Sequence, residues 1–133
     1  MTRDTRQRRA IRTVFADADG PLSPQEVLER AKHTVAGIGL ATVYRNIKLM
    51  VEDSELSPVD LPGEPSRYES VQRAQQHHHF FKCEQCGRVF DIMGCVGNPD
   101  SLAPDGFSVT RHHIVLYGDC QREDCKARAH VSA

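Results

Sequence analysis

The stretch HHHFFKCEQCG, residues 77–87, marks the point at which the chain changes character. Before it, apolar residues recur with helical periodicity; after it, cysteines and histidines cluster. Three strand-like runs also follow, at residues 78–82, 88–92 and 107–117. We therefore predict two small domains, residues 1–72 and 77–133, joined by a hinge at residues 73–76.

Two cysteine pairs have the spacing of a zinc site. Cys83 and Cys86 form a C-x2-C motif followed by glycine, and Cys120 and Cys125 form a C-x4-C motif farther along the chain. Four thiolates suit tetrahedral zinc, and a closed site of this kind stabilises a fold. A thioredoxin-type redox pair needs a βαβ context that the sequence lacks. Cys95 has no partner at ligand spacing, and we expect a small buried residue there rather than a ligand or a redox thiol.

The histidines predict a second metal site. Side chains alternate between the two faces of a strand, so His77 and His79 point one way and His78 the other, toward the hinge and Glu69. If the four cysteines bind one zinc ion, the predicted strand at residues 107–117 comes near the one at residues 78–82. His77, His79 and His112 are then a candidate set of three imidazole ligands. Such an open site suits zinc, iron(II) or manganese(II), and exposed histidines without a ligand role are the alternative.

The first 72 residues predict three helices and a hairpin. A helix is expected over residues 5–18 with Thr5 as its cap, and SPQE, residues 23–26, is a strong start for a second. A third follows the turn at Gly37 and Gly39, and Pro62-Gly63 suits the turn of a hairpin. This order describes a winged helix-turn-helix, although another small α+β domain can show it too.

Local charge favours nucleic-acid binding more than the overall charge does. The formal net charge is -1 and the pI about 6.6, so the whole chain is not polycationic. The N-terminal segment nevertheless holds a group of arginines: Arg3, Arg6, Arg8, Arg9 and Arg12. The third helix leaves Thr42, Tyr44, Arg45 and Lys48 outside its apolar stripe. No apolar run approaches the roughly 18 residues of a membrane span, and we expect a cytoplasmic protein.

The assembled motifs resemble those of the ferric uptake regulator (Fur) family of bacterial metal-dependent repressors. The matching stretches are TRQRRAI, LSPQEVL, GLATVYRNIK, RYE, HHH before CEQCG, and GFSVTRHHIVLYGDCQREDC. The resemblance implies an α+β fold with an N-terminal winged helix and a C-terminal α/β dimerisation domain that holds a four-cysteine structural zinc. It also implies a homodimer that binds palindromic operator DNA when a regulatory metal is loaded, and no enzymatic activity.

The resemblance extends to individual residues. Tyr44 and Arg45 match positions at the DNA bases, with Thr42 beside them, and Lys48 and Arg9 are expected at phosphates. The structural zinc is matched by Cys83, Cys86, Cys120 and Cys125. A hinge metal site is matched by Glu69, His78 and Asp91, and a site in the dimerisation domain by His77, His79 and His112.

Two departures from the family pattern shift the expected sensing site. Phe80 replaces a hinge histidine, and Pro21 or Leu22 stands where another is usual. The regulatory metal is therefore expected at the dimerisation-domain histidines. The glutamate that usually completes that site maps near Asn98 and Asp100, which leaves the fourth ligand open.

Two other functions fit parts of the pattern. In a peroxide sensor of the same fold, iron(II) at the histidines would promote oxidation of His77, His79 or His112 by peroxide, which would add one oxygen atom to that residue. A zinc hydrolase or deaminase would need H-E-x-x-H, or H-x-E followed by P-C-x2-C, and the sequence has neither.

Overall fold

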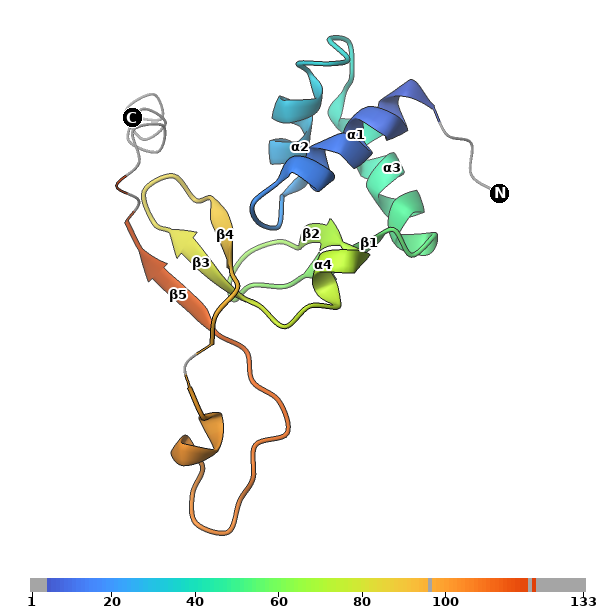
Figure 1. Cartoon of the computed structure of the whole chain (residues 1–133). Coiled ribbons are helices and arrows are strands. Elements are labelled where there is room, and N and C mark those ends of the chain that lie inside the picture. Colours follow the sequence, from blue (N-terminus) through green and yellow to red (C-terminus); the bar gives the residue numbers. More distant parts are fainter. Residues whose placement is uncertain (1–4, 96, 120, 122–133) are drawn as a thin grey trace. The chain divides into compact units, whose positions relative to one another are not determined.

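The computed structural model describes residues 5–95, 97–119 and 121. The chain divides into two compact units, of which the first ends at Gln76 and the second begins at His77. Helices α1 to α3 belong to the first unit and strands β3 to β5 to the second (Figure 1). This mixture of helix and sheet confirms the predicted α+β class. Within the described ranges, no helix has the length and apolar character needed to cross a membrane.

Three capped helices open the first unit. Their bounds are α1 Arg6–Asp17, α2 Pro24–Ala31 and α3 Leu40–Glu52. As predicted, the Thr5 side chain accepts a hydrogen bond from the backbone N–H of Arg8. Ser23 and Glu26 form a full capping box, in which each side chain accepts from the other residue's backbone N–H. These local contacts satisfy backbone donors that helix starts otherwise leave without partners.

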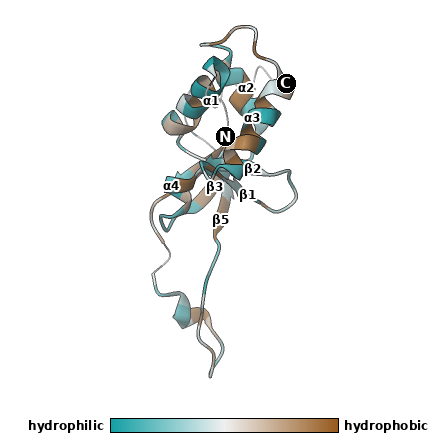
Figure 2. Cartoon of the chain, turned by 90° about the vertical axis from the view of Figure 1, so that its right-hand side faces the viewer, coloured by the Kyte–Doolittle hydropathy of each residue, from teal (hydrophilic) through white to brown (hydrophobic). Residues whose placement is uncertain are grey.

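The core of the first unit lies where the apolar faces of the helices meet. Each helix carries hydrophobic and hydrophilic residues on different sides, as the colouring of Figure 2 shows. Ile11 of α1, Val27 of α2, and Val43 and Met50 of α3 are essentially inaccessible to solvent. Burying each such side chain stabilises the fold by about 1.5–3 kcal/mol. The opposite face of α3 is thereby left at the surface.

A two-stranded antiparallel hairpin follows the helices. Strand β1 spans Leu56–Val59 and strand β2 spans Arg67–Ser70, with Pro58 paired to Tyr68. Gly63 in the connecting loop has a φ of 77°, the left-handed conformation that the predicted turn requires. A single helical turn, α4 Val71–Ala74, comes next. The segment expected to be an irregular hinge thus starts as helix, because Ser70 caps it by accepting from the Arg73 N–H.

Two arginines of the N-terminal segment are held in ion pairs inside the first unit. The Arg8 guanidinium is buried, and its Nη2 lies 2.7 Å from a carboxylate oxygen of Asp53 and 2.7 Å from one of Glu55. Arg12 Nε lies 2.8 Å from the other oxygen of Glu55. Two members of the N-terminal cationic arm, Arg8 and Arg12, are thus paired with carboxylates beyond α3, and Arg8 is also buried.

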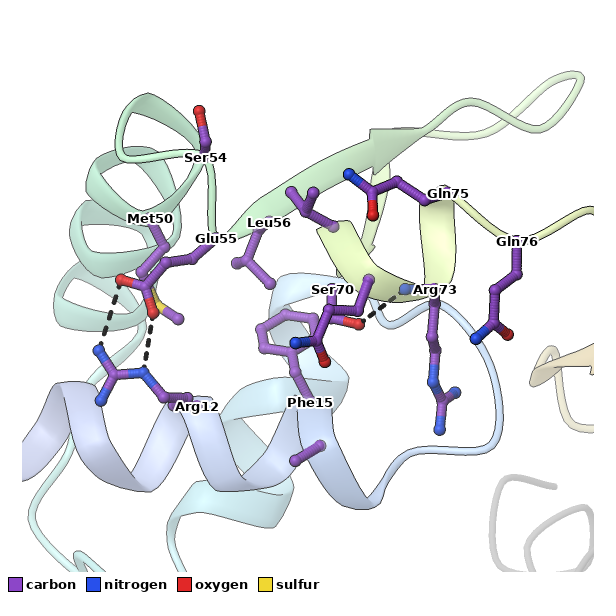
Figure 3. Close-up of a pocket in the computed structure, with 13 residues that line it drawn as sticks. Arg12, Phe15, Met50, Ser54, Glu55, Leu56, Ser70, Arg73, Gln75 and Gln76 are labelled. Atoms are coloured by element: carbon purple, nitrogen blue, oxygen red, sulfur yellow. Dashed lines mark hydrogen bonds and ion pairs between the residues drawn. The ribbon is translucent and has the colours of Figure 1, made fainter.

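These contacts border a pocket of about 720 Å³ in the first unit. Figure 3 shows the Arg12 side chain turned toward Glu55 on one side of the pocket. Phe15 and Leu56 form apolar parts of the pocket wall. The hydrogen bonds to Arg12 and Arg8, opposed by burial, hold the pKa of Glu55 below its ordinary value of 4.5. The Glu55 carboxylate thus links α1 to the start of β1.

We expect acid to weaken the first unit through Glu55. A carboxyl whose pKa is depressed by folding stabilises the fold above its unfolded pKa, and this contribution disappears as pH falls through the lower folded value. The free energy of unfolding, measured with urea from pH 6 downward, should therefore fall below about pH 4.5. Glu55→Gln should reduce stability by about 1 kcal/mol at pH 6 and flatten this fall. Glu29→Gln, an exposed residue of α2, serves as control; equal pH profiles for wild type and Glu55→Gln would contradict the assignment.

The second unit is built on a three-stranded sheet with the order β4-β3-β5. The strands are β3 His79–Cys83, β4 Val89–Ile92 and β5 Val115–Gly118, and a 3-10 turn, η1, spans Pro99–Leu102. Strand β3 pairs with β4 antiparallel and with β5 parallel. The third strand is shorter than the predicted 107–117, since residues 107–114 form no ladder and the chain runs there as a loop.

Close packing at Gly118 fixes β5 against the central strand. Gly118 pairs with Cys83 in the parallel ladder, and its carbonyl accepts a 2.7 Å hydrogen bond from the backbone N–H of Glu84. A Cβ added at Gly118 would lie 2.9 Å from the Phe81 ring, nearer than side chains normally approach. The glycine therefore lets the end of β5 lie against the start of the Cys83–Cys86 turn.

Candidate metal centre and nucleic-acid interface

Helix α3 presents a polar, cationic surface next to the hairpin. Burial of its apolar stripe leaves Tyr44, Arg45 and Lys48 exposed, with Tyr44 at 49%. These three residues line a groove of about 630 Å³ together with Pro58 and Tyr68 of the hairpin. An aromatic hydroxyl, a guanidinium and an ammonium group are thus available side by side, which is the chemistry that reads base edges and phosphates.

The remaining residues expected at DNA occupy more varied positions. Thr42 is half-buried, and its hydroxyl accepts a 3.4 Å hydrogen bond from Arg45 Nη2. That contact limits the directions in which the Arg45 guanidinium points. Arg9 is exposed on α1. Thr42 therefore lies beside Arg45 and can orient its guanidinium.

Three histidines converge in the second unit. His77 and His79 lie two residues apart at the start of β3, so both project from the same face, and their ring centroids are 4.7 Å apart. His112, which precedes β5, places its ring 5.0 Å from each of them. The structure thus brings together the three histidines expected to form one site: His77 and His79, which the strand period groups on one face, and His112 from the segment before β5.

The surroundings of His79 favour its neutral imidazole form. His79 is buried, with 4% of its surface exposed. Burial first, and then the proximity of His77 and His112, lower the pKa of His79 below its ordinary value of 6.5. Metal ions bind imidazole in its neutral form, so the environment suits a ligand.

Cys95 completes a group of four possible metal ligands. Its Sγ lies 3.1 Å from Nε2 of His112 and 3.4 Å from Nε2 of His79. One donor atom from each of Cys95 and the three histidines fits within 4.8 Å of the others. The expectation that Cys95 is a small buried residue is wrong, because it is exposed in the loop after β4.

The polar residues considered for the fourth position lie outside this group. Asp100 Oδ1 accepts a 2.9 Å hydrogen bond from the backbone N–H of Val109. The Asn98 side chain caps η1 by accepting from the Asp100 N–H. Both side chains therefore stabilise the loop between β4 and β5.

His78 points away from the cluster, as the alternation of the strand predicts. Its Nε2 lies 3.8 Å from Asp91 Oδ1 on the neighbouring strand β4, and its ring lies 5.1 Å from that of Phe80. Glu69, the third residue expected at a hinge site, belongs to β2 of the first unit. A metal held by these three residues would need both units, and it stays a prediction.

The first cysteine pair sits in a tight turn between β3 and β4. Cys83 is fully buried and its carbonyl accepts a 2.8 Å hydrogen bond from the N–H of Gly87, which has a φ of 77°. Cys86 lies within this turn, three residues after Cys83, which is the C-x2-C spacing that zinc sites use. Cys120 and Cys125 lie outside the described residues.

Sequence reasoning missed Cys95 because its role depends on a loop with no regular spacing. Cys95 stands between β4 and η1, whereas His112 precedes β5. Only the pairing of both strands with β3 brings these two loops to the same end of the sheet. The sequence feature that could have indicated a ligand role for Cys95 is its position, outside both cysteine pairs, in the domain that also holds the clustered histidines.

The fold and the clustered side chains define a class of protein: a winged-helix unit joined to a small sheet unit that carries metal ligands. The model of the ferric uptake regulator family matches residues 1–117, and the chain belongs to this family. It is therefore a Fur-family regulator, within a class of metal-responsive transcriptional regulators, which confirms the resemblance found in the sequence.

Individual relatives agree with this assignment. The ferric uptake regulation protein of Bacillus subtilis (strain 168) is 29% identical over 129 residues, which cover 89% of this chain and 83% of that protein. The protein of the same name from Escherichia coli (strain K12) is 29% identical over 118 residues, covering 83% and 75%. A solved structure of a zinc-bound manganese uptake regulator matches with a TM-score of 0.75 and 28% identity, covering 90% of this chain and 91% of that one.

Proposed function

We propose that this chain is a repressor that binds palindromic operator DNA as a homodimer when a divalent metal occupies the histidine cluster of its second unit. The observation that carries the proposal is the convergence of His77, His79 and His112 in the same chain as an exposed cationic helix. Metal binding would favour one arrangement of the two DNA-binding units, and DNA would in turn favour the metal-loaded form.

The cluster has dimensions that suit a metal ion. Zinc lies about 2.0–2.1 Å from imidazole nitrogen, so a tetrahedral ion separates two nitrogen ligands by roughly 3.3–3.4 Å. The donor atoms of the cluster already fall within 4.8 Å of one another, and small side-chain rotations bring them to one ion. When bound, the metal would supply a fixed positive centre that holds β3 and the loop before β5 together.

A second, structural zinc is proposed at Cys83 and Cys86, with Cys120 and Cys125 as the other pair. The supporting observation is the parallel ladder, in which Gly118 lies opposite Cys83. The chain therefore leaves β5 beside the first cysteine pair, shortly before the second pair begins. Four thiolates would neutralise and enclose the ion, which is the form of a structural rather than a responsive site.

The dimer is supported by apolar surface on the second unit. Its exposed large hydrophobic residues are Met93, Leu102, Phe107, Leu116 and Tyr117. A second copy of the chain that covers them would place two α3 helices on one DNA molecule, and a two-fold axis makes a palindrome the matching target. In each copy, Tyr44 and Arg45 would contact bases, while Lys48 and Arg9 would contact phosphates.

A DNA-binding titration tests this function. The protein would first be used to select its preferred DNA sequence from a random pool. The regulatory metal would then be removed, and zinc, iron(II) or manganese(II) added back in turn. Fluorescence anisotropy would measure the affinity of the protein for the selected DNA in each state. We expect at least one metal to raise the affinity about 10-fold or more.

Two variants separate the histidine cluster from general metal effects. His112→Ala should remove the response to metal, and His33→Ala, an exposed histidine of the first unit, should preserve it. Operator binding that ignores every metal would contradict the proposed function. If His112→Ala still responds to metal, the regulatory site would instead be assigned to the hinge residues Glu69, His78 and Asp91.

A further inference from the structure

We infer that the Cys95 thiolate is the fourth ligand of the histidine cluster, which makes the site one of three imidazoles and one sulfur and selects a zinc-class metal. The inference rests on the proposed function and specifies the chemistry of its metal site. It starts from two contacts to a single sulfur atom, 3.1 Å from His112 Nε2 and 3.4 Å from His79 Nε2.

These separations fit ligands around one ion. With a zinc–sulfur bond of about 2.3 Å and a zinc–nitrogen bond of about 2.0–2.1 Å, a tetrahedron sets sulfur and nitrogen roughly 3.5 Å apart. Cys95 Sγ lies close to that distance from two imidazole nitrogens at once. A thiol can donate to one imidazole nitrogen and accept an N–H from the other, but a shared metal also accounts for the convergence of His77 on the same group.

The positions of neighbouring polar groups leave sulfur as the fourth donor. Asp100 is engaged by the backbone N–H of Val109, and Asn98 caps η1. Among the described residues, the ligand group that contains the three histidines has Cys95 as its only further member. The carboxylate expected from the family pattern is therefore replaced by a thiolate from the loop after β4.

This replacement has consequences for metal choice. Thiolate and imidazole ligands suit zinc and other borderline or soft ions, whereas manganese(II) prefers carboxylate, carbonyl and water oxygens. Three neutral imidazoles and one thiolate also form a compact four-coordinate set, which zinc accepts without distortion. We therefore expect the site to prefer zinc over manganese(II) and iron(II), and to accept cobalt(II) as a spectroscopic probe.

The test is a cobalt(II) titration of the full-length protein whose four-cysteine site keeps its zinc. Wild type should show the visible bands of tetrahedral cobalt together with a near-ultraviolet thiolate-to-cobalt charge-transfer band. Cys95→Ser should lose the charge-transfer band. In competition with a chelator it should bind zinc at least about 100-fold more weakly, because loss of a residue that only hydrogen-bonds a metal ligand already lowers metal affinity by about 10- to 100-fold. Cys95→Asp should recover binding with its preference shifted toward manganese(II).

Two controls keep the outcomes distinct. Asp100→Asn retains an oxygen that accepts from the Val109 N–H, and it should leave the spectrum and zinc affinity unchanged. His112→Ala should abolish cobalt binding at this site. If wild type lacks the charge-transfer band, or if Cys95→Ser keeps the wild-type zinc affinity while His112→Ala loses it, the thiolate inference is wrong and the proposed function stands. If wild type binds no zinc, cobalt(II), iron(II) or manganese(II) beyond the structural ion, the proposed function itself is overturned.

Discussion

Cys83→Ser should release the structural zinc and unfold the second unit. Cys83 is fully buried at the end of the central strand, so its loss affects both the metal and the sheet around it. Structural zinc contributes on the order of 10 kcal/mol or more to the folding of small zinc domains. A three-stranded sheet of short strands has little other core to offset that loss. Circular dichroism, hydrogen exchange of β3 and metal analysis would measure the effect.

Cys95→Ser is the matched control for this experiment. It removes the same atom from the same unit, yet it should leave the structural zinc content and the hydrogen-exchange protection of β3 unchanged. A Cys83→Ser protein with full zinc content and unchanged protection would show that Cys83 does not hold a structural ion. The two cysteine variants together thus separate the two proposed metal sites.

Arg45→Ala should weaken operator binding by about 10- to 100-fold per half-site, and by more in a dimer that uses two copies. A bidentate contact between arginine and a guanine base is worth about 1–3 kcal/mol. Arg45 is exposed on α3 beside Tyr44, in the groove that the hairpin borders. The loss should be largest for the selected operator and small for unrelated DNA, because a base contact discriminates between sequences.

Lys48→Ala provides the contrasting behaviour expected of a phosphate contact. It should weaken binding to all DNA sequences alike and reduce the slope of log affinity against log salt by about 1 for each copy, or about 2 for the dimer. Lys32→Ala, an exposed lysine just after α2, serves as the control for a general loss of positive charge. If Arg45→Ala binds operator and unrelated DNA as wild type does, the assignment of α3 as the reading helix is wrong.

The sequence predicts the parts of this fold that local chemistry controls. Thr5 and Ser23 cap their helices, and Gly63 permits the hairpin turn, because each effect involves residues within a few positions of one another. The grouping of His77 with His79 likewise follows from the two-residue period of a strand. These features need no knowledge of distant contacts.

Features set by distant contacts were not predictable in the same way. Arg8 appears in the sequence as part of a cationic arm, yet its carboxylate partner Asp53 is 45 positions away. Cys95 appears isolated for a related reason, since the loop that holds it has no period from which a facing residue can be inferred. In both cases the pairing of side chains depends on how helices and strands pack.

Strand β3 has a further consequence, for the spacing of the two proposed metals. It begins with His79 and ends with Cys83, so it carries a ligand of each site. At about 3.3 Å per residue, it separates those ligands by about 13 Å. An insertion or deletion of one residue between them would turn one ligand to the opposite face of the sheet. Substitutions within β3 can therefore alter either metal site, but the length of the strand must stay constant for both sites to persist in one protein.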